Sequence, residues 1–269
     1  MRPVAAGGYC RAVPRPAGRY FPGLAREVTC AELAKAAVGE AARSGRWTKI
    51  IGDFLGGAGG FVPNWPADVL AEAIAQVHAA GGRVAVHAVC PDAVDAAVAA
   101  GVDSVEHGWA VSDAHFAAMR ARNTAWVPTL MPGGLQVACE FAAAMGFSVD
   151  TREWMRTTLD AQPATVARAR AAGVTVLAGT DAGQGPHGTI VDQITMLAGA
   201  GLPATAAIGA GSWTARRWLG LPCLEAGAPA DLVLYGADPR TDLDVLRRPG
   251  LIIMDGQVIE SNAGFAMRD

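Results

Sequence analysis

Residues 83–108 read Arg-Val-Ala-Val-His-Ala-Val, then Cys-Pro and an alanine-rich run, then Gly-Val-Asp-Ser-Val-Glu-His-Gly. Two short runs rich in valine lead to His87 and His107, and the segment between them has the length and composition of one helix. The stretch therefore predicts a strand–helix–strand unit in which each histidine stands at the carboxyl end of a strand.

The carboxyl ends of parallel barrel strands form the face where active sites lie, and neighbouring strands are about 4.8 Å apart. Two imidazoles at such ends can converge on one metal ion. Either histidine alone could equally be a satisfied core or loop residue. Their equivalent positions on successive strands favour metal ligands.

The composition favours one α/β barrel. The chain has 269 residues, of which 51% are hydrophobic, enough for a large core. Its formal charge of -3 gives no reason to expect nucleic acid or an anionic membrane as a partner. Five scattered cysteines without a Cys-x-x-Cys pair indicate a reducing compartment, and we expect the cytoplasm.

No stretch has the pattern of a signal peptide or a membrane span. Prolines and arginines interrupt the first twenty residues. The longest uncharged run, 193–215, is broken by glycines and Pro203, and we expect helices joined by a loop there. The sequence thus predicts a soluble protein.

Strands and helices alternate along most of the chain. Residues 1–23 and 52–60 have loop composition, and 131–150 form a longer connection. Thr29 with Glu32 predicts a capping box, and Gly45 predicts a helix end. We expect strands at 47–51, 84–87, 102–107, 124–128 and 174–181. We expect helices at 29–43, 66–80, 92–100, 113–122 and 151–172, and further helices after the 183–188 loop that end at about 219. Short strands at 231–235 and 251–254 follow, and then a turn at 255–256.

This order predicts a partial TIM (β/α)8 barrel, containing about strands 4–8, with a small C-terminal β appendage. A closed barrel of this kind needs eight strands, so five would leave two unpaired edges and partly uncovered apolar surface. We therefore expect self-association. The predicted domains are 1–226, the partial barrel, and 227–269, the strands of a small composite β domain.

Several phrases resemble the amidohydrolase superfamily, in particular its imidazolonepropionase-like and metal-dependent dipeptidase (prolidase-type) branch. They span about residues 7–260, and the combination is more specific than any one phrase. They are Lys49 at a strand end, His78-Ala-Ala-Gly before Val84-Ala-Val-His87, Val105-Glu-His-Gly108, Gly179-Thr-Asp-Ala-Gly183 with His187-Gly188, and Glu225-Ala-Gly-Ala-Pro-Ala-Asp-Leu-Val-Leu234.

The resemblance implies a metal-dependent hydrolase of amide, peptide or cyclic-amide C–N bonds in small molecules. Lys49 would be carboxylated and bridge two divalent ions, most readily zinc, while His87 and His107 would bind the more exposed ion. Asp181 would bind the buried ion and act as the catalytic base, moving a proton from metal-bound hydroxide to the leaving nitrogen. His187 and Tyr9 would contact the substrate.

The sequence departs from this family at its amino-terminal end. It contains no His-x-His pair, which supplies ligands to the buried ion in the family, and Gly7-Gly8-Tyr9 stands where members commonly have Gly-Gly-His. The first three barrel strands have no counterpart. We therefore expect an amino-terminally truncated chain that binds at most one zinc-like ion and hydrolyses dipeptides negligibly.

Two other functions remain open. The chain could be an inactive fragment or a binding scaffold, or a metal-free barrel lyase in which Lys49 forms a Schiff base. Each residue also has an ordinary structural interpretation: Lys49 as a solvated lysine, Asp181 as a helix cap or turn residue, and His187 as a solvated turn residue. Of the remaining histidines, His78 is expected to pack or cap its helix, and His115 to be exposed.

Overall fold

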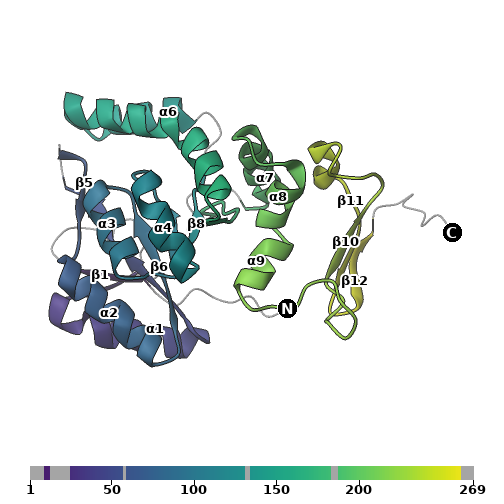
Figure 1. Ribbon diagram of the computed structural model, residues 1–269, viewed down its shortest axis with the longest axis horizontal. Helices are drawn as coiled ribbons and strands as arrows, with labels where there is room; N and C mark the ends of the chain where they lie inside the picture. The colour runs from purple at the N-terminus through teal and green to yellow at the C-terminus, as the bar shows by residue number, and fades with distance from the viewer. Residues whose placement is uncertain (1–8, 13–24, 57–58, 131–133, 183–186, 262–269) are drawn as a thin grey trace. The chain divides into compact units, whose positions relative to one another are not determined.

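The computed structural model describes residues 9–12, 25–56, 59–130, 134–182 and 187–261 (Figure 1). The chain divides into two compact units, Val4–Val176 and Leu177–Asp269. The domain boundary at 226/227 expected from composition stays a prediction. Each unit is described separately below.

A parallel sheet forms the centre of the first unit (Figure 1). Its order is β2-β1-β3-β6-β7-β8-β9, and each neighbouring pair is parallel. The strands are β1 (Tyr9–Ala12), β2 (Ala25–Val28), β3 (Trp47–Ile51), β6 (Arg83–Ala88), β7 (Ser104–His107), β8 (Ala125–Val127) and β9 (Thr175–Val176).

The five strands predicted from the sequence are β3 and β6 to β9, and their parallel arrangement is confirmed. The expectation of no element before residue 24 is wrong at Tyr9–Ala12, which forms β1 and pairs with both β2 and β3. The edge of β3 is therefore paired. Proline- and glycine-rich flanks hid this four-residue strand, because such composition ordinarily marks loops.

Helices α1 to α4 follow their strands in chain order and pack on one another in that order. They are α1 (Leu33–Ser44), α2 (Ala67–Ala79), α3 (Pro91–Ala99) and α4 (Asp113–Arg122). The predicted capping box is present, since Glu32 accepts hydrogen bonds from the backbone N–H of Thr29 at 2.9 Å and from its hydroxyl at 2.8 Å. It opens a short 3-10 helix, η2 (Cys30–Glu32), which leads into α1, and α1 ends at Gly45 with φ 77°.

Two predicted loops contain regular structure. Within 52–60, the strand β4 (Asp53–Leu55) pairs antiparallel with β5 (Phe61–Pro63). Within 131–150 lies α5 (Gly134–Ala144), which is followed by the long helix α6 (Val149–Ala171). Phe61 contacts the rings of Trp109 and Phe147 edge-on, at centroid distances of 5.6 and 6.0 Å. This aromatic packing holds the β4–β5 hairpin and the α5–α6 connection together.

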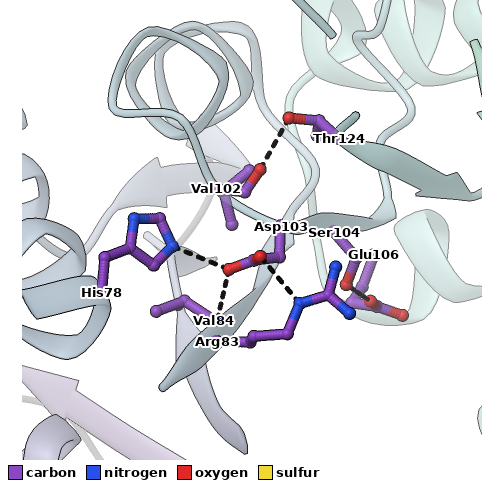
Figure 2. Close-up of polar contacts among 8 residues, drawn as sticks. All are labelled: His78, Arg83, Val84, Val102, Asp103, Ser104, Glu106 and Thr124. Atoms are coloured by element: carbon purple, nitrogen blue, oxygen red, sulfur yellow. Dashed lines mark hydrogen bonds and ion pairs between the residues drawn. The ribbon is translucent and has the colours of Figure 1, made fainter. Parts of the chain in front are cut away.

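Ion pairs lie at the amino-terminal end of β6 and just before β7 (Figure 2). The carboxylate of Asp103 accepts hydrogen bonds from the Nε of Arg83 at 2.9 Å and from the backbone N–H of Val84 at 2.8 Å. Its Oδ2 also lies 2.8 Å from Nε2 of His78. His78 therefore contacts Asp103 at the end of the sheet opposite His87 and His107.

The second unit combines helices with a small antiparallel sheet, as expected for the C-terminal residues. The sheet order is β10-β11-β12, and the predicted turn Asp255-Gly256 joins β11 to β12. Arg247 of η4 pairs with Asp192 of α7 at 2.6 Å. The elements are α7 (Ile190–Gly199), α8 (Ala204–Ala210), α9 (Trp213–Trp218), β10 (Leu232–Tyr235), η4 (Leu243–Arg247), β11 (Pro249–Met254) and β12 (Gln257–Ser261).

Among the residues that the structure describes, no helix is long and apolar enough to cross a membrane.

Candidate metal centre

Lys49 and His87 lie on the same face of the parallel sheet. In the register of β3 and β6, Lys49 is beside Ala85 and Ile51 is beside His87, and residues two apart in a strand share a face. Both side chains are half-buried, whereas the alternating residues Ile50 and Val86 are fully buried. The register therefore places Lys49 and His87 where both could contribute to one site.

His107 reaches His87 through an unusual backbone conformation. The register pairs His107 with Ala88, so regular alternation would place it on the opposite face from His87. Its φ is 64°, in the left-handed region, which ends the alternation at the last residue of β7. The two imidazole rings consequently lie 4.7 Å apart between centroids, inclined at 70°.

Two side chains hold the backbone of His107 in this conformation. Its carbonyl oxygen accepts hydrogen bonds from Nε1 of Trp126 at 3.0 Å and from Nε2 of Gln162 at 3.3 Å. The next residue, Gly108, has φ 54°, and a Cβ there would lie 2.5 Å from Nε1 of Trp126. The glycine of the Glu-His-Gly phrase is therefore required by the turn and by the close approach of Trp126.

The electrostatic environment keeps His107 neutral. Burial holds the pKa of His107 well below the usual range, and electrostatic interactions with His87 and Lys49 lower the pKa further. A neutral imidazole has a free lone pair, which is the form that binds metal ions. The environment of His107 thus suits a metal ligand.

Sequence reasoning missed Asp53, a residue of β4. Its side chain is 0% exposed, and its Oδ1 lies 3.2 Å from Nε2 of His87. The available signal was an acidic residue directly after a strand end, in the same kind of position as the two histidines. It was overlooked because the surrounding glycines were interpreted as a loop.

Three further residues, Asp181, His187 and Tyr9, were predicted for the site from the sequence. Asp181 belongs to the unit Leu177–Asp269, is exposed, and has φ 50°. His187 is exposed in a turn shortly before α7. The backbone of Tyr9 on β1 is aligned with Lys49, and its side chain lies outside the described part of the chain. The roles expected for these residues stay predictions.

The remaining histidines have partners of their own. The His78 side chain contacts Asp103, as described above. Nε2 of His115 lies 2.7 Å from Oδ1 of Asp95, and the His115 side chain is only 12% exposed, so the expectation that it is exposed is wrong. It also closes a capping box with Ser112 at the start of α4.

Within the described ranges, no group of three or more His, Cys, Asp or Glu side chains is arranged to hold a metal ion. The candidate metal ligands in the first unit are therefore the adjacent side chains of His87 and His107. Lys49 lies on the same face of the sheet as His87. Two imidazoles fit a divalent ion as part of its ligand set, and Asp53 lies beside the His87 ring, with its Oδ1 3.2 Å from Nε2.

A parallel α/β sheet with histidines at the carboxyl ends of its strands is the arrangement in which TIM-barrel enzymes place their active sites. The comparison with known families agrees, because the Amidohydrolase family matches residues 40–259. The chain belongs to this family.

Its relatives include an uncharacterized protein of Mycobacterium tuberculosis and one of Mycobacterium bovis, each 41% identical over 242 residues. The match covers 89% of this chain and 65% of each relative. The chain thus spans slightly less than two thirds of the length of these relatives.

Solved structures with a similar fold include a Xaa-Pro dipeptidase with bound methionine, at 28% identity and a TM-score of 0.72, which covers 87% of this chain and 60% of that one. A putative prolidase from Bifidobacterium longum has 24% identity and a TM-score of 0.77, covering 95% and 65%. An ochratoxinase of A. niger has 18% identity and a TM-score of 0.77, covering 95% and 65%. The last two likenesses concern the fold alone.

Proposed function

We propose that this chain carries part of the active site of a metal-dependent hydrolase that cleaves amide, peptide or cyclic-amide C–N bonds in small molecules. The observation that carries the proposal is the pairing of His87 and His107, whose rings lie 4.7 Å apart at neighbouring strand ends. Membership of the Amidohydrolase family supports hydrolysis over the lyase chemistry considered for Lys49.

In this proposal β3 and β6 to β9 are strands 4–8 of an eight-stranded barrel. The likeness to solved relatives with TM-scores of 0.72 and 0.77 supports this arrangement. The antiparallel sheet β10 to β12 would then belong to a small β appendage beginning near residue 227.

Lys49, His87, His107 and Asp181 would hold the metal, for which zinc suits the two imidazoles. When bound, a divalent ion supplies Lewis acidity to the scissile carbonyl and makes water a stronger acid. His87 and His107 would bind through neutral ring nitrogens, and Lys49 would take part through a carboxylated Nζ. Asp181 would hold the proton taken from the attacking water and give it to the departing nitrogen.

The similarity to a Xaa-Pro dipeptidase, at 28% identity, supports a proposal for the substrate class. We infer that dipeptides with a carboxyl-terminal proline are the first substrates to test. His187 and Tyr9 are the residues that we propose for contacts to the substrate.

Zinc binding tests the metal site. We expect the chain to bind zinc in a chelator competition, and His87→Gln and His107→Asn each to weaken binding by at least about tenfold. Asparagine is chosen at His107 because it tolerates the left-handed backbone. The matched control is His115→Gln, since glutamine preserves the capping box and this histidine lies in another pair. No binding by the parent chain, or equal binding by all four proteins, would contradict the proposed site.

Turnover tests the reaction. We expect hydrolysis of Xaa-Pro dipeptides from a fusion of this chain with the part of the mycobacterial relative that lies outside the match, and loss of that activity in Asp181→Asn. The same fusion is treated with borohydride and a carbonyl substrate, which would trap a Schiff base if Lys49 acted as an amine nucleophile. Trapping without a zinc requirement would favour the lyase over the hydrolase.

A further inference from the structure

Asp53 is a fully buried carboxylate to which the proposed reaction gives no role. Its Oδ2 accepts hydrogen bonds from the backbone N–H groups of Val89 and Cys90, each at 2.6 Å. Cys90 is the N-cap of α3, so the carboxylate also lies at the positive end of a helix dipole. These interactions offset part of the cost of burying the carboxylate and leave Oδ2 fully engaged as an acceptor.

The other oxygen of Asp53 faces His87. Oδ1 lies 3.2 Å from Nε2 of the imidazole, and neither atom has a hydrogen-bond partner elsewhere in the described residues. An ionised carboxylate can only accept hydrogen bonds. The favourable arrangement therefore has the imidazole proton on Nε2, directed at Oδ1.

The backbone fixes this pair. The N–H of Gly52, the residue before Asp53, donates a hydrogen bond to the carbonyl of His87 at 2.7 Å. A Cβ at Gly52 would lie 2.6 Å from the same oxygen, so the two segments are as close as glycine allows. Val89 and Cys90, which bind the other carboxylate oxygen, follow His87 in the chain. Backbone hydrogen bonds before and after His87 therefore fix the position of Asp53 relative to His87.

We propose that Asp53 is a positioning residue that keeps the proton of His87 on Nε2 and leaves Nδ1 as the atom that binds the metal. A neutral imidazole has a proton on one ring nitrogen and a lone pair on the other. A proton held on Nε2 therefore leaves the lone pair on Nδ1. Carboxylates that accept a hydrogen bond from a ligating histidine orient the ring and raise its basicity. Metal binding at Nδ1 rests on the proposed function. The position of the proton on Nε2 does not depend on that function.

The test uses the full chain, metal-free and labelled with ¹⁵N-histidine. Ring-nitrogen shifts and couplings of His87, assigned through His87→Gln, report which nitrogen is protonated. We expect the Nε2–H tautomer in the parent chain. In Asp53→Asn the amide oxygen can still accept from the backbone N–H groups, and its NH₂ then faces Nε2, so the proton should move to Nδ1. Zinc affinity should fall about 10- to 100-fold with it.

The control is Asp95→Asn, which removes the carboxylate partner of His115 and should leave the His87 signals and zinc binding unchanged. An Nδ1–H tautomer of His87 in the parent chain would overturn the inference, even if Asp53→Asn does not fold. An unchanged tautomer and zinc affinity in Asp53→Asn would overturn it too, while leaving the proposed function intact. An Asp53-dependent Nε2–H tautomer in a chain that binds no zinc would support the positioning role and contradict the proposed function.

Discussion

The ring of His107 lies 4.7 Å from the ring of His87, although strand register aligns His107 with Ala88 on the opposite face of the sheet. The left-handed backbone at His107 accounts for this, and hydrogen bonds from Trp126 and Gln162 hold it. The pairing at the strand ends thus depends on a local departure from regular β-structure. Such departures recur at functional sites.

The neutral state of His107 should make stability depend on pH. Its pKa is lowered in the folded chain, chiefly by burial, whereas the unfolded chain has the ordinary value of about 6.5. Below that pH the unfolded state binds a proton that the folded state does not. The free energy of unfolding should therefore fall as the pH decreases below about 6.5, by up to about 1.4 kcal/mol per pH unit from this residue. Above that pH, His107 is neutral in both states and no longer makes stability depend on pH.

Urea unfolding between pH 5 and 7, with a chelator present, measures this effect. We expect a shallower loss of stability in His107→Asn than in the parent chain. Equal slopes for the two proteins would contradict the inferred neutral state of His107.

Gly52 should tolerate no side chain. In Gly52→Ala the new methyl group would lie 2.6 Å from the carbonyl oxygen of His87 and 2.8 Å from Cγ1 of Val86. We expect a destabilisation of about 1–3 kcal/mol, because neither neighbour can move without disturbing β6. Urea unfolding provides the measurement. Gly59→Ala is the control, since a Cβ at Gly59 has nothing within 4 Å, and a similar loss there would show that the effect is not one of packing at His87.

The sequence predicted the strands at the centre of the sheet because their β-branched runs are bounded by helices and glycines. It also predicted His87 and His107 at strand ends, since each valine-rich run leads to a histidine. It could not predict how His107 reaches His87. That depends on a positive φ, and the following glycine is a weak signal of it.

Other residues escaped prediction because their placement depends on tertiary contacts. Asp53 lies in a three-residue strand beside a glycine-rich segment, and it is the backbone N–H groups of Val89 and Cys90, distant in sequence, that hold its carboxylate. The β1 strand pairs with β2 and β3, which follow it in the chain. Asp181 was expected at the end of a strand over 174–181, whereas β9 spans Thr175–Val176 alone.

The cysteines should differ sharply in reactivity. Burial, with the nearby charge of Asp53, raises the pKa of the Cys90 thiol to about 12. Cys30 is an exposed free thiol at the start of η2. Because the thiolate is the reactive form, iodoacetamide at pH 8 should modify Cys30 in the native chain and Cys90 only after denaturation. Peptide mass spectrometry measures both, and comparable native rates would contradict the buried position of Cys90.

Asp103 should be the most sensitive carboxylate at the amino-terminal end of the sheet (Figure 2). Its carboxylate binds Arg83 at 2.9 Å, the N–H of Val84 at 2.8 Å and Nε2 of His78 at 2.8 Å, and both Asp103 and Arg83 are largely buried. Asp103→Asn removes a largely buried negative charge that pairs with Arg83, and we expect a loss of about 2 kcal/mol in the free energy of unfolding.

The control for this prediction is Glu153→Gln, which removes a carboxylate from a solvent-exposed pair with Arg156 on α6. Exposed pairs contribute little because water screens them and two side chains must be ordered, so no measurable loss is expected. Urea unfolding of the two variants beside the parent chain measures the difference. If Asp103→Asn were as stable as Glu153→Gln, the contacts of Asp103 would not stabilise the ends of β6 and β7.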